Sequence, residues 1–182
     1  VVASEDAGFV DHSGVEWDSI ESAYDKSQKA GARAARSNEQ LAKGQVQRPG
    51  TAPARPPVSP KLVGGSTITQ QLAKNLFLSG ERTAMRKAQE IVLAYMLEAL
   101  LDKRRILTIY LNSVEWGEGI FGAQAAARHY FHVDASQLGA MQAARLAVML
   151  PAPKRFEKNP GSAYVSGRAG TIVSRMGGVE LP

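Results

Sequence analysis

The pattern of apolar and polar positions along the chain predicts a mainly α-helical protein. Beyond Lys61, apolar residues recur at helical spacing, and no alternating run is long enough for a sizeable sheet. Capping residues, glycines and prolines interrupt this pattern and indicate the approximate ends of each helix. The predicted helices cover residues 67–78, 83–101, 103–111 and 121–131, then a helix that Ser136 caps and Pro151 stops, and a last one that Pro160-Gly161-Ser162 opens and Gly177-Gly178 ends.

Two of these helices carry more specific signals. The residues Thr67-Ile68-Thr69-Gln70 fit a capping box, in which the Thr and Gln side chains each satisfy a backbone N–H of the other residue. The helix over 83–101 is apolar nearly all round between Glu90 and Glu98. A helix without a polar face is typical of a protein interior, so we predict that it is the central buried helix.

The segment from Lys26 to Lys61 does not follow the helical pattern. It contains five prolines, few large apolar residues, and eight Lys or Arg against the single acid Glu39, so it holds more positive charge than the whole chain's +5. We predict a flexible, basic, proline-rich loop over residues 26–61. It is either a solvated linker or a cationic flap near anionic lipid headgroups or a pyrophosphate. Nucleic acid is disfavoured, because the segment has no aromatic residues for base stacking.

Composition limits the class of protein. A chain of 182 residues with 44% hydrophobic and 21% charged residues is typical of a single globular domain. The absence of cysteine excludes disulfides and thiolate metal sites. The longest unbroken apolar run, Ile91 to Leu97, is far shorter than the roughly 20 residues of a membrane-spanning helix. The first residues lack an initiator Met and a signal-peptide pattern, so we expect the sequence to begin inside a longer protein.

The first cluster of chemically competent side chains lies near the N-terminus. Glu5, Asp6, Phe9 and His12 fall within ten residues, beside the predicted loop. When two carboxylates lie side by side, the charge of one can raise the pKa of the other. A carboxyl group with a raised pKa is suited to general acid–base catalysis. On composition alone a structural reading is favoured over a functional one: Glu5 or Asp6 caps a helix, and His12 satisfies a backbone carbonyl.

A second cluster lies on the helix over 67–78. Thr67, Gln71 and Lys74 occupy positions i, i+4 and i+7, which places a hydroxyl, an amide and an ammonium group on one stripe. Ile68 and Leu72 belong to a separate, apolar stripe. Such a helix can bury one side and present the other to a polar, anionic ligand, although an ordinary solvated face would have the same composition.

The third cluster leads into the apolar helix. Arg86 and Glu90 are four residues apart and could form no more than a helix salt bridge. Glu90 borders the most apolar stretch of the chain, where an ionised carboxylate needs partners or acquires a raised pKa. This position favours a functional role.

Together these strings resemble the peptidoglycan glycosyltransferase family, particularly its monofunctional members. The resemblance extends from Glu5 to about Met176, and its chief departure is the long proline-rich stretch before Lys61. The strings that carry it are Glu5-Asp6-x-x-Phe9-x-x-His12-x-Gly14, the run from Gly64-Gly65-Ser66-Thr67 to Lys74-Asn75-Leu76-Phe77, Arg86-Lys87-x-x-Glu90, Lys103-Arg104-Arg105-Ile106-Leu107-x-x-Tyr110-Leu111-Asn112, Glu115-Trp116-Gly117, and Ala144-Arg145-Leu146-Ala147-x-x-Leu150-Pro151.

The resemblance implies a lysozyme-like, two-lobed helical fold with the active cleft between the lobes. It implies polymerisation of lipid II into β-1,4-linked glycan, with inversion and release of undecaprenyl pyrophosphate. The partners are then lipid II, the growing lipid-linked glycan and cell-wall synthesis or division proteins. The domain is expected on the periplasmic side of a bacterial inner membrane, with a membrane helix upstream that is absent from this chain.

The resemblance also assigns roles to individual residues. It marks Glu5 as the general base, with Asp6 beside it as a like charge, and Glu90 as a second catalytic group that organises the cations or helps hold a metal. Some family members use Mg²⁺ or Mn²⁺, and the sequence leaves that open. The remaining positions are expected to bind substrate: Lys74, Arg86 and Lys87 at the donor phosphates and sugar, Thr67, Gln71 and Asn75 at polar groups, and Phe9 and His12 as walls of the cleft.

Two other functions remain as alternatives. A lysozyme-like hydrolase or lytic transglycosylase would share the fold and use a lone Glu as its acid. Such an enzyme has no need of a cationic cluster for pyrophosphate, so Lys74, Arg86 and Lys87 argue against it. A non-catalytic lipid or cell-wall binding module is the other alternative, although every expected catalytic position carries a competent residue.

Overall fold

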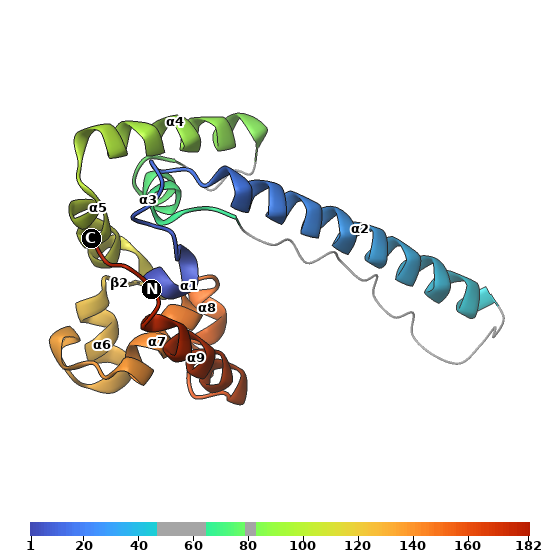
Figure 1. Cartoon of the computed structure of the whole chain (residues 1–182). Helices are drawn as coiled ribbons and strands as arrows, with labels where there is room; N and C mark the ends of the chain where they lie inside the picture. The colour runs from blue at the N-terminus through green and yellow to red at the C-terminus, as the bar shows by residue number, and fades with distance from the viewer. Residues whose placement is uncertain (47–64, 79–82) are drawn as a thin grey trace. The chain divides into compact units, whose positions relative to one another are not determined.

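The computed structural model describes residues 1–46, 65–78 and 83–182 (Figure 1). The chain divides into two compact units, one of Val1–Val15 with Ser66–Pro182 and one of Glu16–Gly65. In the described residues of both, the regular structure is almost entirely helical, so the predicted mainly α fold is confirmed. The expected lobes with a cleft between them, and the treatment of residues 1–182 as one domain, stay predictions.

The first unit contains helices and one small antiparallel sheet, in which Glu115 lies opposite Phe121 and Gly117 opposite Ile120. Helix α3 (Ile68–Phe77) packs on α4 (Ala84–Leu100) and α5 (Lys103–Ser113), while α7 (Ala140–Met149) packs on α9 (Ala163–Met176). The elements in chain order are α1 (Val2–Glu5), α3 (Ile68–Phe77), α4 (Ala84–Leu100), α5 (Lys103–Ser113), β1 (Glu115–Gly117), β2 (Ile120–Phe121), α6 (Ala123–Phe131), the 3-10 helix η1 (Ala135–Gln137), α7 (Ala140–Met149), α8 (Pro153–Phe156) and α9 (Ala163–Met176).

Two apolar clusters form the interior of this unit. The larger one joins the N-terminal segment to α3, α5 and β1 through Phe9, Ile68, Leu72, Ile106 and Trp116, all with almost no exposed surface. The smaller one lies between α7 and α9. The larger cluster anchors the segment around Phe9 to the helix that carries the second group of candidate residues.

Most of the predicted helix ends are confirmed. Thr67 and Gln70 form the capping box, and Ser162 caps α9, which ends at Gly177. The predicted cap at Ser136 is wrong: Ser136 lies inside η1, and the next helix begins only after Gly139. A polar residue before an apolar run signals a helix start but does not distinguish a single 3-10 turn from a longer helix.

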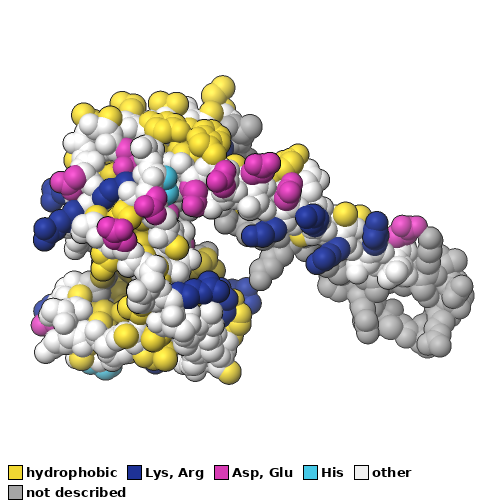
Figure 2. All heavy atoms as spheres, in the orientation of Figure 1, with side chains coloured by type: hydrophobic (Ala, Val, Ile, Leu, Met, Phe, Trp, Pro, Cys, Tyr) yellow, Lys and Arg dark blue, Asp and Glu magenta, His cyan; other side chains and the backbone are white. Residues whose placement is uncertain are grey.

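The prediction that the helix over 83–101 is centrally buried is wrong. Only one side of α4 faces the interior, through Glu90 and Ala94. On the other side Val92, Met96 and Leu100 are 57%, 53% and 78% exposed, and in Figure 2 hydrophobic side chains gather over this helix. A helix that is apolar all round is expected to be shielded from water, but the pattern does not show that this chain itself covers every side of the helix.

The second unit is built on one long helix, α2 (Trp17–Val46), of 30 residues. The flexible loop expected over residues 26–61 is therefore corrected over its first part, because residues 26–46 are helical. The prolines all lie at position 49 or later, and the residues before them are mostly helix formers such as Ala, Lys, Arg and Gln. The rest of the expected loop, from residue 47, lies outside the described residues. Among the described helices, none combines the length and apolar character needed to cross a bilayer.

Candidate active site

Glu5, the expected general base, lies at the end of α1 and is half-buried. Its Oε2 accepts a hydrogen bond from Nε2 of Gln71 on α3, at 3.1 Å. Burial raises the pKa of the Glu5 carboxyl, the hydrogen bond from Gln71 opposes this rise, and the negative charge of Asp6 adds to it by less. The like charge expected to raise the pKa of Glu5 is thus present, but burial is the larger cause.

The amide of Gln71 is itself oriented by Tyr110. The buried Tyr110 hydroxyl on α5 donates to Oε1 of Gln71 at 2.8 Å, and this leaves the amide nitrogen facing Glu5 and the carbonyl of Ser66. Burial also raises the pKa of Tyr110, and the charges of Glu5 and Asp6 add to the effect, so the hydroxyl keeps its proton. The structure therefore contains a chain of hydrogen bonds from Tyr110 through Gln71 to the candidate base.

Asp6 is buried, with 4% of its surface exposed, and both of its oxygens have partners. Oδ2 accepts from the backbone N–H of Ile68, the first residue of α3, at 2.9 Å, and Oδ1 lies 2.8 Å from Nε2 of His12. Because Nδ1 of His12 accepts from the N–H of Gly14 at 3.2 Å, Nε2 must carry the proton that it donates to Asp6. Asp6 caps a helix, as the structural reading of the sequence held, while His12 bonds this carboxylate rather than a backbone carbonyl.

The segment between Asp6 and Gly14 is also fixed by Lys103 at the start of α5. Its Nζ lies 4.5 Å from the ring centroid of the fully buried Phe9, and it donates to the backbone carbonyl of His12. The same ammonium group pairs with Oε1 of Glu98 on α4 at 2.8 Å, and Glu98 also accepts from Thr69 on α3 at 2.6 Å. One cation thereby connects the segment that carries the candidate base to α3, α4 and α5.

The predicted polar stripe of α3 borders a cavity of about 560 Å³. Gln71, Lys74 and Asn75 line it from α3, and Arg86 lines it from α4. The buried Nε of Arg86 has no hydrogen-bond acceptor among the described residues. The cavity therefore combines two cationic side chains with the amide that contacts Glu5. Its other lining residues are Leu78, Ser113, Val114, Glu115, Phe121, Leu150, Pro151 and Pro153.

Glu90 is almost completely buried, with 2% of its surface exposed, and forms an ion pair with Lys87. Lys87 also donates to the hydroxyl of Ser66 at 2.9 Å. Among the described residues Glu90 pairs with Lys87 at i, i+3 rather than with Arg86 at i, i+4, and Arg86 lines the cavity. In the described part of the chain no group of three or more His, Cys, Asp or Glu side chains could hold a metal ion by itself, and the Glu90 carboxylate is paired with Lys87.

The structure thus divides the predicted site residues into two groups. Gln71, Lys74, Asn75 and Arg86 line the cavity, and Glu5 contacts it through Gln71. The second group does not line the cavity and makes contacts within the protein, with Lys87 the most exposed at 39% of its side chain: Asp6, Phe9, His12, Thr67, Lys87 and Glu90. In this group the Thr67 hydroxyl donates to the carbonyl of Gly14 at 2.6 Å and accepts from the N–H of Gln70.

Sequence reasoning missed the parts played by Ser66, Tyr110 and Ser113. Ser66 contacts both Lys87 and Gln71, Tyr110 orients Gln71, and Ser113 lines the cavity at the end of α5. Ser66 and Tyr110 belong to segments that resemble family motifs, and this resemblance is the sequence feature that could have indicated their roles. Periodicity could not have found them, because these contacts join residues from different helices.

Comparison with known proteins places the chain in a family. Residues 58–177 match the transglycosylase family. A biosynthetic peptidoglycan transglycosylase of Janthinobacterium sp. (strain Marseille) is 50% identical over 182 residues, which are 100% of this chain and 67% of that protein. Proteins of the same name from Bordetella pertussis (strain Tohama I) and Burkholderia pseudomallei (strain K96243) are also 50% identical over the whole chain, which spans 65% and 60% of their lengths. Because the family match covers most of the chain and these relatives align with all of it, the chain belongs to the transglycosylase family.

Proposed function

We propose that this domain polymerises lipid II into β-1,4-linked glycan, with Glu5 as the general base. The transglycosylase family acts on lipid II and on glycan chains, and its work belongs to the cell envelope. The observation that carries the proposal is the link between Glu5 and the cavity: Gln71 donates to Glu5 and also lines the space that Lys74 and Arg86 border.

Glu5 takes the proton of the acceptor sugar's 4-hydroxyl as the reaction begins. The hydroxyl oxygen forms a bond to the anomeric carbon of the donor, and the bond from that carbon to the pyrophosphate oxygen breaks. A single displacement of an α-linked pyrophosphate gives the β linkage without a covalent intermediate on the enzyme. The raised pKa of Glu5 makes its carboxylate a stronger base than an ordinary surface carboxylate.

Lys74 and Arg86 stabilise the negative charge that grows on the departing pyrophosphate. An ammonium and a guanidinium that already border the cavity require little rearrangement when the charge develops there, which is the condition for effective electrostatic catalysis. The buried Nε of Arg86, without an acceptor among the described residues, is a donor suited to a phosphate oxygen.

Lys87 and Glu90 act on the site through Ser66. Glu90 holds the ammonium of Lys87 against the Ser66 hydroxyl, and Ser66 precedes the cap of α3. Gln71 donates to the carbonyl of this same serine, so the pair supports the residue that contacts Glu5. Glu90 is therefore a positioning residue, and no step of the proposed reaction passes through a metal.

Contact with a membrane surface follows from the lipid tail of the substrate and from α4. The exposed Met85, Val92, Met96 and Leu100 recur at helical spacing on one side of this helix, and Leu76 and Phe77 at the end of α3 are exposed as well. An exposed apolar surface of this extent is typical of an interaction site. We place it against the lipid that presents lipid II, on the periplasmic side of the inner membrane.

The decisive experiment uses fluorescent lipid II in detergent with the purified chain and Glu5→Gln. Loss of the general base should lower the yield of polymer by roughly a hundredfold or more, since such bases contribute about 10² to 10⁴ in rate. Asp11→Asn is the matched control, because Asp11 is an exposed acid close to Glu5 in the sequence. The products are resolved by gel electrophoresis.

A polymer ladder from Glu5→Gln equal to that of the original chain would remove Glu5 from the role of base. Purified glycan incubated with the same protein tests the cleaving alternative in parallel. Release of soluble fragments, together with no polymer from lipid II, would contradict the proposal and favour a lytic enzyme.

A further inference from the structure

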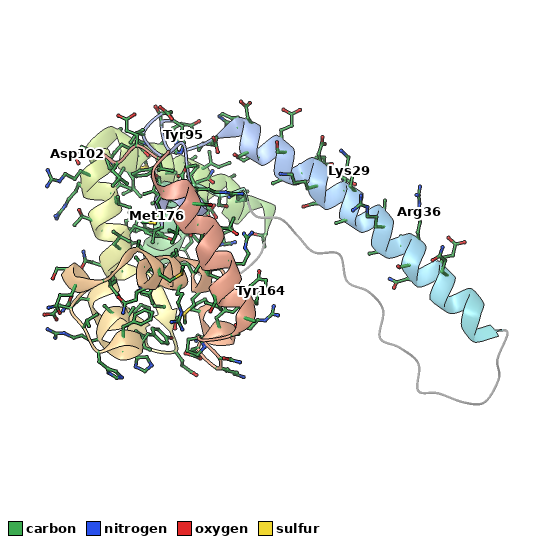
Figure 3. All side chains as sticks on the ribbon, turned by 60° about the horizontal axis from the view of Figure 1, so that its bottom comes forward. Lys29, Arg36, Tyr95, Asp102, Tyr164 and Met176 are labelled. Atoms are coloured by element: carbon green, nitrogen blue, oxygen red, sulfur yellow. The ribbon has the colours of Figure 1, made fainter. Side chains whose placement is uncertain are left out.

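Four cations form one stripe along α2. Lys26, Lys29, Arg33 and Arg36 follow one another at intervals of three, four and three residues, which places them on the same side of a helix. All four side chains are exposed. Figure 2 shows dark blue side chains gathered along one face of α2, and Figure 3 labels Lys29 and Arg36 among them. We call these four residues the α2 basic stripe.

The stripe carries a local excess of positive charge, with its acidic neighbours Asp25 and Glu39 outside it on either side. Between Lys26 and Asn38 the sequence contains no acidic residue, and among the described residues no ion pair engages any of the four side chains. The acids Asp18, Glu21 and Asp25 all precede the stripe. A solvated helix more often alternates the sign of its charges at i, i+4 spacing, so the segregation here is a feature that solubility alone does not require.

The dimensions of the stripe suit a flat, highly charged surface. Ten residues of helix extend about 15 Å, so neighbouring cations lie well within the Debye length of about 8 Å at physiological salt. Their potentials therefore add. The residues between them are Ala, Gly, Ser and Gln, whose small or flexible side chains let a helix lie against a surface.

We propose that the α2 basic stripe binds the headgroups of anionic lipids in a bilayer. The proposal rests on the proposed function in one respect: a domain that acts on a lipid-linked substrate works beside such headgroups. Positive charge facing a negative surface is favourable by about 1 kcal/mol for each Lys or Arg near it, equivalent to about fivefold in affinity. Nucleic acid is the less favoured partner, because no aromatic residue lies between Lys26 and Arg36 to stack on bases.

The contact is electrostatic and does not insert into the bilayer. The stripe contains no large apolar residue, and the exposed Trp17 and Tyr24 precede it on α2. Binding through the stripe must therefore depend on lipid charge and weaken as salt screens it. The exposed apolar residues of α4 differ in both respects, because apolar burial depends little on headgroup charge or salt. These differences allow the two surfaces to be tested separately.

The experiment measures co-sedimentation of the chain with vesicles of phosphatidylcholine alone and of phosphatidylcholine with phosphatidylglycerol. The test variant carries Lys26→Gln, Lys29→Gln, Arg33→Gln and Arg36→Gln, which keep good helix formers in place. The control variant removes the same charge from exposed arginines of α5 and α9 through Arg104→Gln, Arg105→Gln, Arg168→Gln and Arg175→Gln. A third variant, Lys26→Arg with Lys29→Arg, keeps the charge.

The original chain, the control and the Arg variant should prefer anionic vesicles, and high salt should abolish the preference. The test variant should lose on the order of 600-fold in affinity for anionic vesicles, about fivefold for each of the four charges, and keep its affinity for neutral ones. Circular dichroism and polymerisation of lipid II in detergent check its fold and its activity. If the proposed function were wrong, no form of the chain would make polymer in the detergent assay. If only the lipid-binding proposal were wrong, polymerisation would be normal and the preference for anionic vesicles would not depend on the stripe.

Equal preference for anionic vesicles in the test variant and the original chain would overturn the proposal. It would also be overturned if the original chain showed no preference between the two kinds of vesicle. Binding of a single-stranded RNA that depended on the stripe, without a preference for anionic vesicles, would assign the stripe to nucleic acid instead.

Discussion

The hydroxyl of Tyr110 controls the candidate base without touching it. It fixes the Gln71 amide so that the nitrogen faces Glu5, and the hydrogen bond from that nitrogen lowers a pKa that burial raises. A general base acts only when deprotonated, so kcat/KM falls as the pH drops through the pKa of Glu5 in the folded protein. Whatever loosens Gln71 should therefore move the acidic limb of the pH profile upward.

The substitution Tyr110→Phe tests this relation. It leaves Oε1 of Gln71 without its donor and frees the amide to rotate, so the pKa of Glu5 rises further and the acidic limb moves to higher pH. The pH dependence of kcat/KM for lipid II polymerisation measures the shift. Tyr164→Phe is the control, because Tyr164 is exposed on α9. A lower rate with an unmoved acidic limb would mean that Tyr110 contributes only to packing.

The sequence predicted which residues belong to the candidate site better than it predicted which residues they contact. Gln71, Lys74 and Asn75 were predicted from helical spacing and the family strings, and they do share a cavity with Arg86. Helical spacing made Arg86 one possible partner of Glu90, and the structure pairs Glu90 with Lys87 instead. Positions i+3 and i+4 are both within reach on a helix, so spacing could not decide between them, and the contacts of Ser66 decide in favour of Lys87.

At the scale of the helices, the side chain of Lys103 connects three helices to the N-terminal segment. At the start of α5 it pairs with Glu98 of α4, which accepts from Thr69 of α3, and it holds the carbonyl of His12. Both members of this pair are largely buried, with side chains 19% and 10% exposed. Removing one partner leaves the other charge buried without compensation, which is much more costly than losing an exposed pair.

We therefore expect Lys103→Met to lower the free energy of unfolding by about 3 kcal/mol. The double variant Lys103→Met with Glu98→Gln should recover part of this loss, because the uncompensated carboxylate is gone. Lys154→Met is the control: its pair with Glu115 spans 3.6 Å at an exposed side chain, and it should change stability by less than about 1 kcal/mol. Urea unfolding measures all three. A loss for Lys103→Met no larger than that of the control would contradict the role of Lys103.

Helix positions could be predicted well, but their surroundings could not. The bounds of α3, α4, α5 and α9 follow from capping residues and periodicity, which are local. Whether a helix is covered depends on what packs on it, and among residues 1–46, 65–78 and 83–182 only one side of α4 is covered. In α2, composition resembled a loop because the prolines after position 48 were averaged with the helix formers before them.

At the scale of the whole molecule, the chain exposes two surfaces of opposite chemistry. The α2 basic stripe attracts charge, whereas the outer side of α4 presents apolar side chains to solvent. We expect the exposed apolar residues of α4 to contact a lipid surface rather than water, because burial of apolar surface is favourable by about 25 cal/mol for each Å². The two surfaces should respond to different conditions, and the α4 surface should act even on an uncharged bilayer.

The substitution Met96→Glu tests the α4 surface. Burial of a methionine side chain is worth about 1.5 to 3 kcal/mol and a carboxylate disfavours lipid, so affinity for phosphatidylcholine vesicles should fall at least about tenfold. High salt should not abolish the binding that remains in the original chain. Met176→Glu on α9 is the matched control, because Met176 is 41% exposed and Met96 is 53% exposed. Figure 3 labels Met176.

Polymerisation in detergent should be unchanged in both variants, whereas polymerisation on vesicles should fall only for Met96→Glu. Equal vesicle binding by the two variants would contradict contact between α4 and lipid, since they introduce the same charge at comparably exposed positions.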